Sequence, residues 1–173
     1  MGAYFWHKKV ESPIDISNSD GLIHGINLIK EFEGCHLNAY PDPLTGKLPI
    51  TIGWGSTRDF NGSPFKMGRK ITQKYADTLL LHELNIMVVK HLCKIPYWNE
   101  MSDEMRGALL SFGYNLGAGF YGAPGFNTIT KNLREKNWKS IPETLKLYCN
   151  PGTKVEAGLL RRRKAEGELW KNF

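Results

Sequence analysis

Three stripes of apolar residues at helical spacing predict the main helices of this chain. The first helix is capped by Ser19 or Asp20 and ends at Gly34. The second starts near Thr72 and continues for about 20 residues, and the third is capped by Ser102. The apolar positions are, in chain order, Leu22, Ile26 and Ile29; Leu80, Leu84, Met87, Val88 and Leu92; and Met105, Leu109, Phe112 and Leu116.

Residues 38–70, between the first two helices, follow a different pattern. Glycine and proline recur throughout this segment and forbid a long helix. The short apolar stretch at Ile50–Ile52 fits a strand between turns. A glycine-rich loop follows the third helix, and further helices are expected at residues 126–137, 140–149 and 156–171.

These elements predict an α+β fold that is mainly helical and has two lobes. A small β-bearing lobe is expected at about residues 34–70 and a helical lobe at about residues 71–173. The long second helix connects them. Residues 1–17 have no clear period and are expected to form an N-terminal extension of this single domain.

The composition excludes several classes of protein. With 41% hydrophobic, 12% aromatic and 23% charged residues, the 173-residue chain has the make-up of a globular domain. No apolar run approaches the ~20 residues that a membrane span needs. The start of the chain also lacks the apolar core of a secretory signal. We therefore expect a soluble protein made without an export signal.

The formal net charge of +6 is carried by one end of the chain. Residues 1–130 have equal numbers of basic and acidic side chains, whereas residues 131–173 have eleven Lys and Arg against five Asp and Glu. A basic end on a neutral body suggests an anionic partner such as nucleic acid, anionic lipid or a bacterial wall polymer. Charge alone favours the simpler alternative, a solvated helix face.

Cysteine and histidine form no pattern typical of a disulfide framework or a metal site. Cys35, Cys93 and Cys149 are widely spaced and odd in number, which fits a reducing compartment. His82 and Glu83 are not followed by a second histidine at the spacing of a zinc motif. We predict that the protein uses no metal and no cofactor.

Glu33 has the sequence context of a proton donor. It lies in the last turn of the first expected helix, where the negative end of the helix dipole and the nearby Glu31 both disfavour a charged carboxylate. A carboxyl that keeps its proton near neutral pH is what a general acid needs. Taken alone, however, a glutamate near a helix end is usually an ordinary surface residue.

Asp42 and Thr51 add a second carboxyl and a hydroxyl. Prolines on both sides of Asp42 restrict its backbone, and no neighbour in sequence suppresses its ionisation. Two carboxyls in unlike environments are what cleavage of a glycosidic bond requires. Thr51 points to the opposite strand face from Ile50 and Ile52, so its hydroxyl can hold a water in a cleft. Both residues also fit plain structural roles in a turn and a strand.

The order of these residues matches a known pattern. Glu33 is followed nine residues later by Asp42, and Thr51 directly precedes Ile-Gly-Trp-Gly. With two later blocks, the pattern resembles the phage-type lysozymes, glycoside hydrolase family 24, over roughly residues 20–170. The matching blocks are Leu28–Gly34, Ala39–Asp42, Thr51–Gly55, Leu110–Gly117 and Gly158–Glu166.

The resemblance implies a lysozyme-like fold and hydrolysis of the β-1,4 bond between N-acetylmuramic acid and N-acetylglucosamine in peptidoglycan. It implies that Glu33 is the general acid, that Asp42 is the base or an electrostatic partner, and that Thr51 positions a water. It places Tyr114 and Asn115 at the sugar-binding cleft. No cofactor is implied.

Two departures from the family pattern leave other functions open. The gap between Asp42 and Thr51 is longer than in many relatives, and Ser56 stands where many relatives have histidine. A catalytically silent glycan-binding module and a lytic transglycosylase remain alternatives, whereas nucleic-acid binding is supported by charge alone. Arg161–Arg163 fits a solvated face, carboxylate partners within the fold, or attraction to anionic wall polymers.

The same resemblance implies where and with what the protein acts. As a muramidase involved in cell lysis, it is expected to act on bacterial peptidoglycan as a monomer, without nucleic acid and without membrane insertion. Because the sequence predicts no export signal, we expect it to stay in the cytoplasm of the bacterial host until it is released to the wall.

Overall fold

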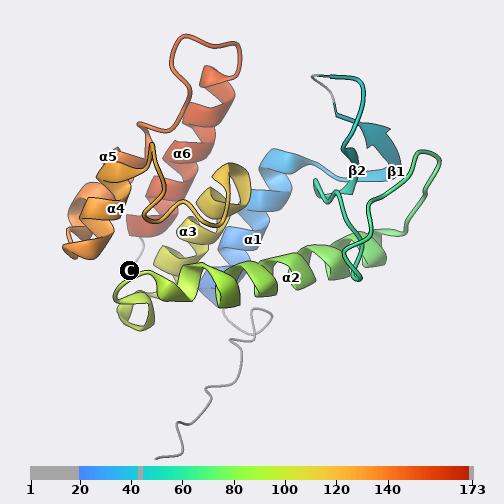
Figure 1. Ribbon diagram of the computed structural model, residues 1–173. Helices are drawn as coiled ribbons and strands as arrows, with labels where there is room; N and C mark the ends of the chain where they lie inside the picture. The colour runs from blue at the N-terminus through green and yellow to red at the C-terminus, as the bar shows by residue number, and fades with distance from the viewer. Residues whose placement is uncertain (1–19, 43–44, 172–173) are drawn as a thin grey trace, which may run out of the picture.

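The computed structural model of the chain describes residues 20–42 and 45–171 (Figure 1). The expected extension over residues 1–17 and the predicted cap at Ser19 lie outside these residues. The described part contains, in chain order, α1 (Asp20–Glu33), β1 (His36–Pro41), β2 (Ile50–Gly53), α2 (Gln73–Lys90), α3 (Asp103–Leu116), α4 (Asn127–Arg134), α5 (Ile141–Leu145) and α6 (Glu156–Lys171). Short 3-10 turns cover Leu92–Lys94, Trp98–Glu100 and Trp138–Ser140. The predicted α+β, mainly helical class is confirmed.

Helices α2 and α3 begin where the sequence predicts. The Thr72 hydroxyl accepts a hydrogen bond from the Tyr75 N–H at 3.2 Å, and Ser102 accepts one from the Met105 N–H at 3.2 Å. Each cap satisfies a backbone donor that the first helical turn leaves without a partner.

Helix α2 extends under the other helices, with the two strands at its N-terminal end and the α4–α5 region beyond its C-terminal end (Figure 1). The whole apolar stripe predicted for this helix is buried. Its residues are Leu80, Leu84, Met87, Val88 and, just beyond the helix, Leu92. Burial of this face, more than helix propensity, holds such a long helix in place.

Two clusters of buried side chains stabilise the fold. The larger one joins α1, α3 and α6 and includes Ile29, Phe112 and Trp170, all fully buried. The smaller cluster packs β2 against α2; its buried members are Ile50, Ile52, Phe65 and Leu79. The sheet is therefore attached to the helices through a separate apolar contact.

The two strands form an antiparallel pair with Tyr40 opposite Thr51 and Pro41 opposite Ile50. The register shifts between His36 and Tyr40. Thr51 is half-buried while the residues on either side of it in β2 are buried, as the predicted alternation requires.

The expected helices at 126–137 and 140–149 are shorter in the structure. Helix α4 ends at Arg134 because Lys136 takes a positive φ of 56°, which no helix continues through. Helix α5 begins only at Ile141, with Pro142 in its first turn, where the missing N–H of proline costs nothing.

The crossing of α1 over α3 depends on the absence of a side chain at Gly25. A Cβ at this position would lie 2.4 Å from the Gly107 carbonyl oxygen. We expect Gly25→Ala to lower the free energy of unfolding by about 1–3 kcal/mol, since the backbones must move apart. Gly158→Ala on α6 is the control: nothing lies within 4 Å of its Cβ position, and replacing an exposed helical glycine stabilises by about 0.5 kcal/mol. Denaturant unfolding of both variants measures the contrast, and equal stabilities would contradict it.

Candidate active site

Glu33 is the last residue of α1, and its side chain lines a cleft. The helix ends here because Gly34 adopts a φ of +69°, which favours glycine, and its N–H bonds the Lys30 carbonyl at 3.2 Å. The Glu33 side chain is 25% exposed. It is therefore held by the protein on one side and accessible on the other.

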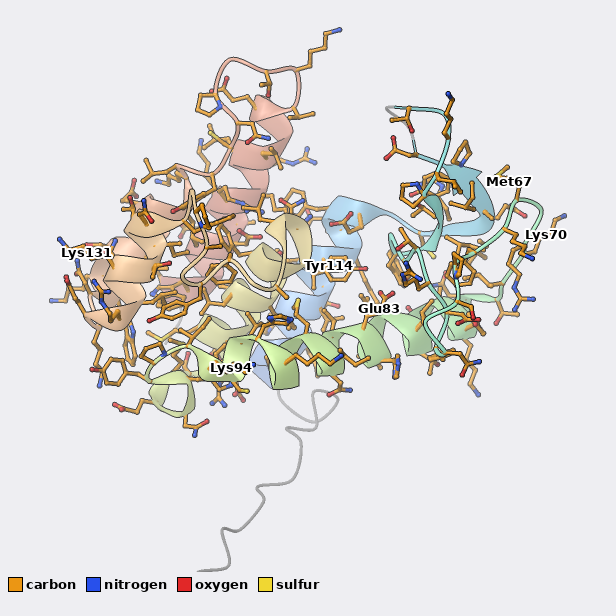
Figure 2. All side chains as sticks on the ribbon, viewed as in Figure 1. Met67, Lys70, Glu83, Lys94, Tyr114 and Lys131 are labelled. Carbon is orange, nitrogen blue, oxygen red and sulfur yellow. The ribbon has the colours of Figure 1, made fainter. Side chains whose placement is uncertain are left out.

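The cleft has a volume of about 450 Å³ and is lined by residues from three helices and from the segment after β2. Tyr114 and Glu83, labelled in Figure 2, lie close together in its wall between α3 and α2. The lining residues are Glu33, Gly55, Ser56, Thr57, Glu83, Ile86, Met87, His91, Gly113, Tyr114, Asn115, Gly117 and Ala118.

Arg162 of α6 holds the Glu33 carboxyl from the protein interior. This guanidinium is 3% exposed, and its Nη1 lies 2.6 Å from Glu33 Oε1. Its Nη2 donates to the Ser111 carbonyl at 3.2 Å. The sequence predicted only negative neighbours for Glu33, so the positive charge beside it is a correction to that environment.

Glu166 is fully buried between two guanidinium groups. It accepts a hydrogen bond from the Ser111 hydroxyl at 2.7 Å, and it forms ion pairs with Arg162 at 3.3 Å and Arg163 at 3.0 Å. Burial raises the pKa of Glu166 and lowers the pKa of Arg163 to about 10, because desolvation penalises the charged form of each. Of the three explanations for Arg161–Arg163, carboxylate partners within the fold apply to Arg162 and Arg163. The exposed Arg161 lies over the Phe32 ring.

Thr51 belongs to β2 and shares its sheet face with a residue of β1. Thr51 and Tyr40 are cross-strand partners, so their side chains share one face. Burial, and after it the negative charge of Glu33, raises the pKa of the Tyr40 hydroxyl. Glu33 is therefore close enough to Tyr40 for its charge to act on that hydroxyl.

Asp42 follows β1 and organises the turn after it. Its Oδ1 accepts hydrogen bonds from the Thr45 N–H at 2.8 Å and the Thr45 hydroxyl at 3.1 Å. The described residues that line the cleft include neither Asp42 nor Thr51. The structure therefore brings Glu33 together with Tyr114 and Asn115, and leaves Thr51 on the adjoining sheet and Asp42 in the turn after β1.

Tyr114 and Asn115, near the C-terminal end of α3, are each held by a second element. The Tyr114 hydroxyl donates to the Trp54 carbonyl at 2.9 Å. Burial, followed by the negative charges of Glu83 and Glu33, raises its pKa far above the ordinary value. The Asn115 Oδ1 accepts from Arg163 at 3.0 Å, so α6 orients this amide in the cleft.

Trp54, in the turn after β2, anchors the sheet to the helices. Its indole N–H donates to Asp77 at 2.9 Å, and Lys30 pairs with the same carboxylate at 2.7 Å. Burial opposes the effect, but hydrogen bonds from Lys30, Trp54 and Gln73 together lower the pKa of Asp77. The cleft-lining segment after β2 is thus tied to α1, α2 and α3.

Glu83 is a cleft residue that the sequence analysis considered only as part of a metal motif. Its Oε2 accepts a hydrogen bond from the Ser56 hydroxyl at 2.8 Å and lies 3.5 Å from the Tyr114 hydroxyl. Leu79 and Met87, four residues before and after it on α2, are both buried. A carboxyl that interrupts such an apolar row is the signal that identifies this position.

The described residues contain no group of three or more His, Cys, Asp or Glu side chains placed to hold a metal ion. They also include no helix long and apolar enough to cross a bilayer. Cys35, Cys93 and Cys149 form no disulfide. The cleft itself presents carboxyl, hydroxyl and amide groups, which suit proton transfer to a polar ligand.

Comparison with known proteins supports this chemistry. The profile of the phage lysozyme family matches residues 30–166. The endolysin of Bacillus phage B103 is 33% identical over 148 residues, which cover 84% of this chain and 52% of that protein. The endolysin of Lactococcus phage c2 is 34% identical over 150 residues, covering 85% and 58%. The chain thus spans about half the length of these relatives.

Solved structures of similar shape come from the same group of proteins. An endolysin from the Escherichia coli O157:H7 phage FAHEc1 superposes with a TM-score of 0.66 at 28% identity, covering 86% of this chain and 91% of its own. A P22 lysozyme mutant gives a TM-score of 0.66 at 27% identity, covering 86% and 95%. The family match over residues 30–166 includes every residue that lines the cleft and both strands, and this chain belongs to the phage lysozyme family.

Proposed function

We propose that the protein is a muramidase that hydrolyses the β-1,4 bond between N-acetylmuramic acid and N-acetylglucosamine in bacterial peptidoglycan during cell lysis. The observation that carries this proposal is the Glu33 carboxyl, fixed by Arg162 and open to a cleft of about 450 Å³. Membership of the phage lysozyme family and the endolysin names of its relatives support it.

Glu33 is the proposed general acid, which protonates the oxygen of the leaving sugar. Its partial exposure allows contact with a bound glycan, and the ion pair with Arg162 fixes its orientation. As the bond breaks, Glu33 becomes a carboxylate, and the guanidinium stabilises that product form.

Asp42 is the proposed base or electrostatic partner, and Thr51 is proposed to position the attacking water. Thr51 shares a sheet face with Tyr40, and after burial the negative charge of Glu33 contributes to the raised pKa of the Tyr40 hydroxyl. Asp42 follows β1 directly, two residues after Tyr40. This placement supports a water held between the sheet and the cleft, on the side of the sugar ring away from the acid.

Tyr114 and Asn115 are the proposed sugar-binding residues. Both line the cleft beside Glu33, and each is oriented by a hydrogen bond from or to another element. Oriented amide and hydroxyl groups suit the N-acetyl and hydroxyl groups of the glycan. The cleft would then separate a β-bearing lobe at about 34–70 from a helical lobe at about 71–173.

Mass spectrometry of the fragments released from purified peptidoglycan tests this function. A muramidase yields soluble fragments that end in reducing N-acetylmuramic acid. Anhydro ends would instead show a lytic transglycosylase. Retained wall binding without fragments from active-site-intact protein would show a glycan-binding module, and either of these results would overturn the proposal.

A further inference from the structure

Glu83 joins three parts of the cleft wall at one carboxyl oxygen. Its Oε2 accepts a hydrogen bond from the Ser56 hydroxyl at 2.8 Å and lies 3.5 Å from the Tyr114 hydroxyl. These partners lie 27 and 31 residues away in sequence, in the segment after β2 and in α3. Glu83 itself belongs to α2, so a single group connects the sheet side of the cleft to two helices.

The joined groups lie next to the proposed acid. Gly55 precedes Ser56, and a Cβ on Gly55 would lie 3.7 Å from Glu33 Oε2 and 3.8 Å from the Tyr114 hydroxyl. The Tyr114 hydroxyl in turn donates to the carbonyl of Trp54 at 2.9 Å. A shift of the Trp54–Ser56 turn would therefore change the space between Glu33 and Tyr114.

We propose that Glu83 is a positioning residue for glycan hydrolysis, which holds the Trp54–Ser56 turn and Tyr114 at a fixed place beside Glu33. The proposal rests on the proposed muramidase function of the same cleft. Glu83 acts through Ser56 and Tyr114, and it is not assigned a contact with the substrate.

The contacts of Glu83 are with hydroxyl groups and not with a cation, which suits a positioning role better than the role of a purely structural ion pair. The titratable groups that share the cleft with Glu83 are Glu33 of α1, Tyr114 of α3 and His91 beyond the end of α2. The segment after β2 contributes hydroxyls and no charge at this point, and the nearest lysine of α1, Lys30, pairs with Asp77. Glu83 is thus held by hydroxyl groups, which bond a neutral carboxyl as well as an ionised one.

Burial raises the pKa of Glu83, although the hydrogen bond that the Ser56 hydroxyl donates opposes the shift. At pH values between the ordinary and the raised pKa, the folded protein therefore retains a proton on Glu83 that the unfolded chain has lost. The contribution of Glu83 protonation to the free energy of unfolding is therefore fully present at pH values below the ordinary pKa, and it is lost as the pH rises through the raised pKa. A glutamine at this position removes the ionisation and keeps the shape and hydrogen-bonding capacity of the side chain.

The test compares Glu83→Gln and Glu83→Ala with wild type and with Lys74→Ala, an exposed control on the same helix. We expect Glu83→Ala to lower kcat on peptidoglycan by roughly 10-fold to 100-fold, since small misplacements of catalytic groups cost this much. We expect Glu83→Gln to restore kcat to within about 3-fold of wild type, because its amide can still bond both hydroxyls. Rates are measured well below each unfolding midpoint, so that loss of folded protein does not enter.

A second readout uses the unfolding midpoint across pH. The midpoint of Glu83→Gln relative to wild type is expected to rise as the pH is raised above 4.5, the ordinary pKa of the carboxyl. Wild-type kcat in Glu83→Ala, or failure of glutamine to rescue, would each overturn the positioning role. Inactive wild-type protein would overturn the proposed function and this inference together, whereas active wild type with unaffected Glu83 variants would overturn this inference alone.

Discussion

Glu33→Gln is expected to reduce the release of peptidoglycan fragments by roughly 10²- to 10⁴-fold, the usual contribution of a general acid. Glutamine matches the size of glutamate and can still accept the hydrogen bond that Arg162 donates to Glu33 at 2.6 Å. It has no proton to give to a leaving sugar at neutral pH. The substitution therefore removes the proposed chemistry and preserves the geometry.

The same variant should remain folded. The Glu33 side chain is partly exposed, and Arg162 keeps its contacts with Ser111 and Glu166 when Glu33 is neutral. Glu31→Gln serves as the control, since Glu31 is exposed on the same helix only two residues away. If Glu33→Gln releases fragments as fast as Glu31→Gln does, Glu33 is not the acid.

Helices with a continuous apolar stripe could be predicted from the sequence, because burial of one face decides where they form. Helices α1, α2 and α3 follow their stripes. Thr72 caps α2 and Ser102 caps α3, as local chemistry requires. Strand β1 was not predicted. Its residues alternate only weakly in burial, and its pairing with β2 depends on partners nine or more residues further along the chain.

The place of Glu33 at the end of a helix could be predicted from sequence because it is set by local features, whereas its role as an acid was implied by the family resemblance. Glu33 is the last residue of a helix that an adjacent glycine ends, and both features are read within a few residues. The surroundings of Glu33 could not be predicted. Arg162 reaches it across 129 residues of sequence, and Glu83 reaches Ser56 across 27. Such contacts exist only after α6 and α2 have packed against the rest of the fold.

Ser56 illustrates the same limit. It was noted as a departure from the family pattern, with no consequence that sequence alone could assign. In the structure its hydroxyl is buried and bonds Glu83 at 2.8 Å. Because the residue at this position is small and neutral, it gives the Glu83 carboxyl a hydroxyl partner and no cationic partner. The charge of this part of the cleft therefore depends on positions 56 and 83 together.

The largest effect on stability is expected from Glu166→Ala. Glu166 is 0% exposed and is the common partner of Arg162 and Arg163, which are 3% and 0% exposed. Removing it leaves the buried Arg163 guanidinium without its carboxylate and leaves Arg162 with Glu33 as its remaining carboxylate partner. Breaking a buried ion pair in this way costs about 3–5 kcal/mol, which for a chain of this size lowers the thermal midpoint by roughly 10 °C.

The matched control is Glu168→Ala, two residues further along α6. Glu168 also pairs with a basic residue three positions on, Lys171 at 2.8 Å, but its side chain is 72% exposed. Exposed pairs of this kind contribute about 0–1 kcal/mol, because water screens the charges and the side chains lose entropy. Thermal or denaturant unfolding of both variants compares the same chemical change in two environments. Equal midpoints would contradict the conclusion that burial makes the Arg162–Glu166–Arg163 group, which contacts Ser111 and Asn115 of α3, important for stability.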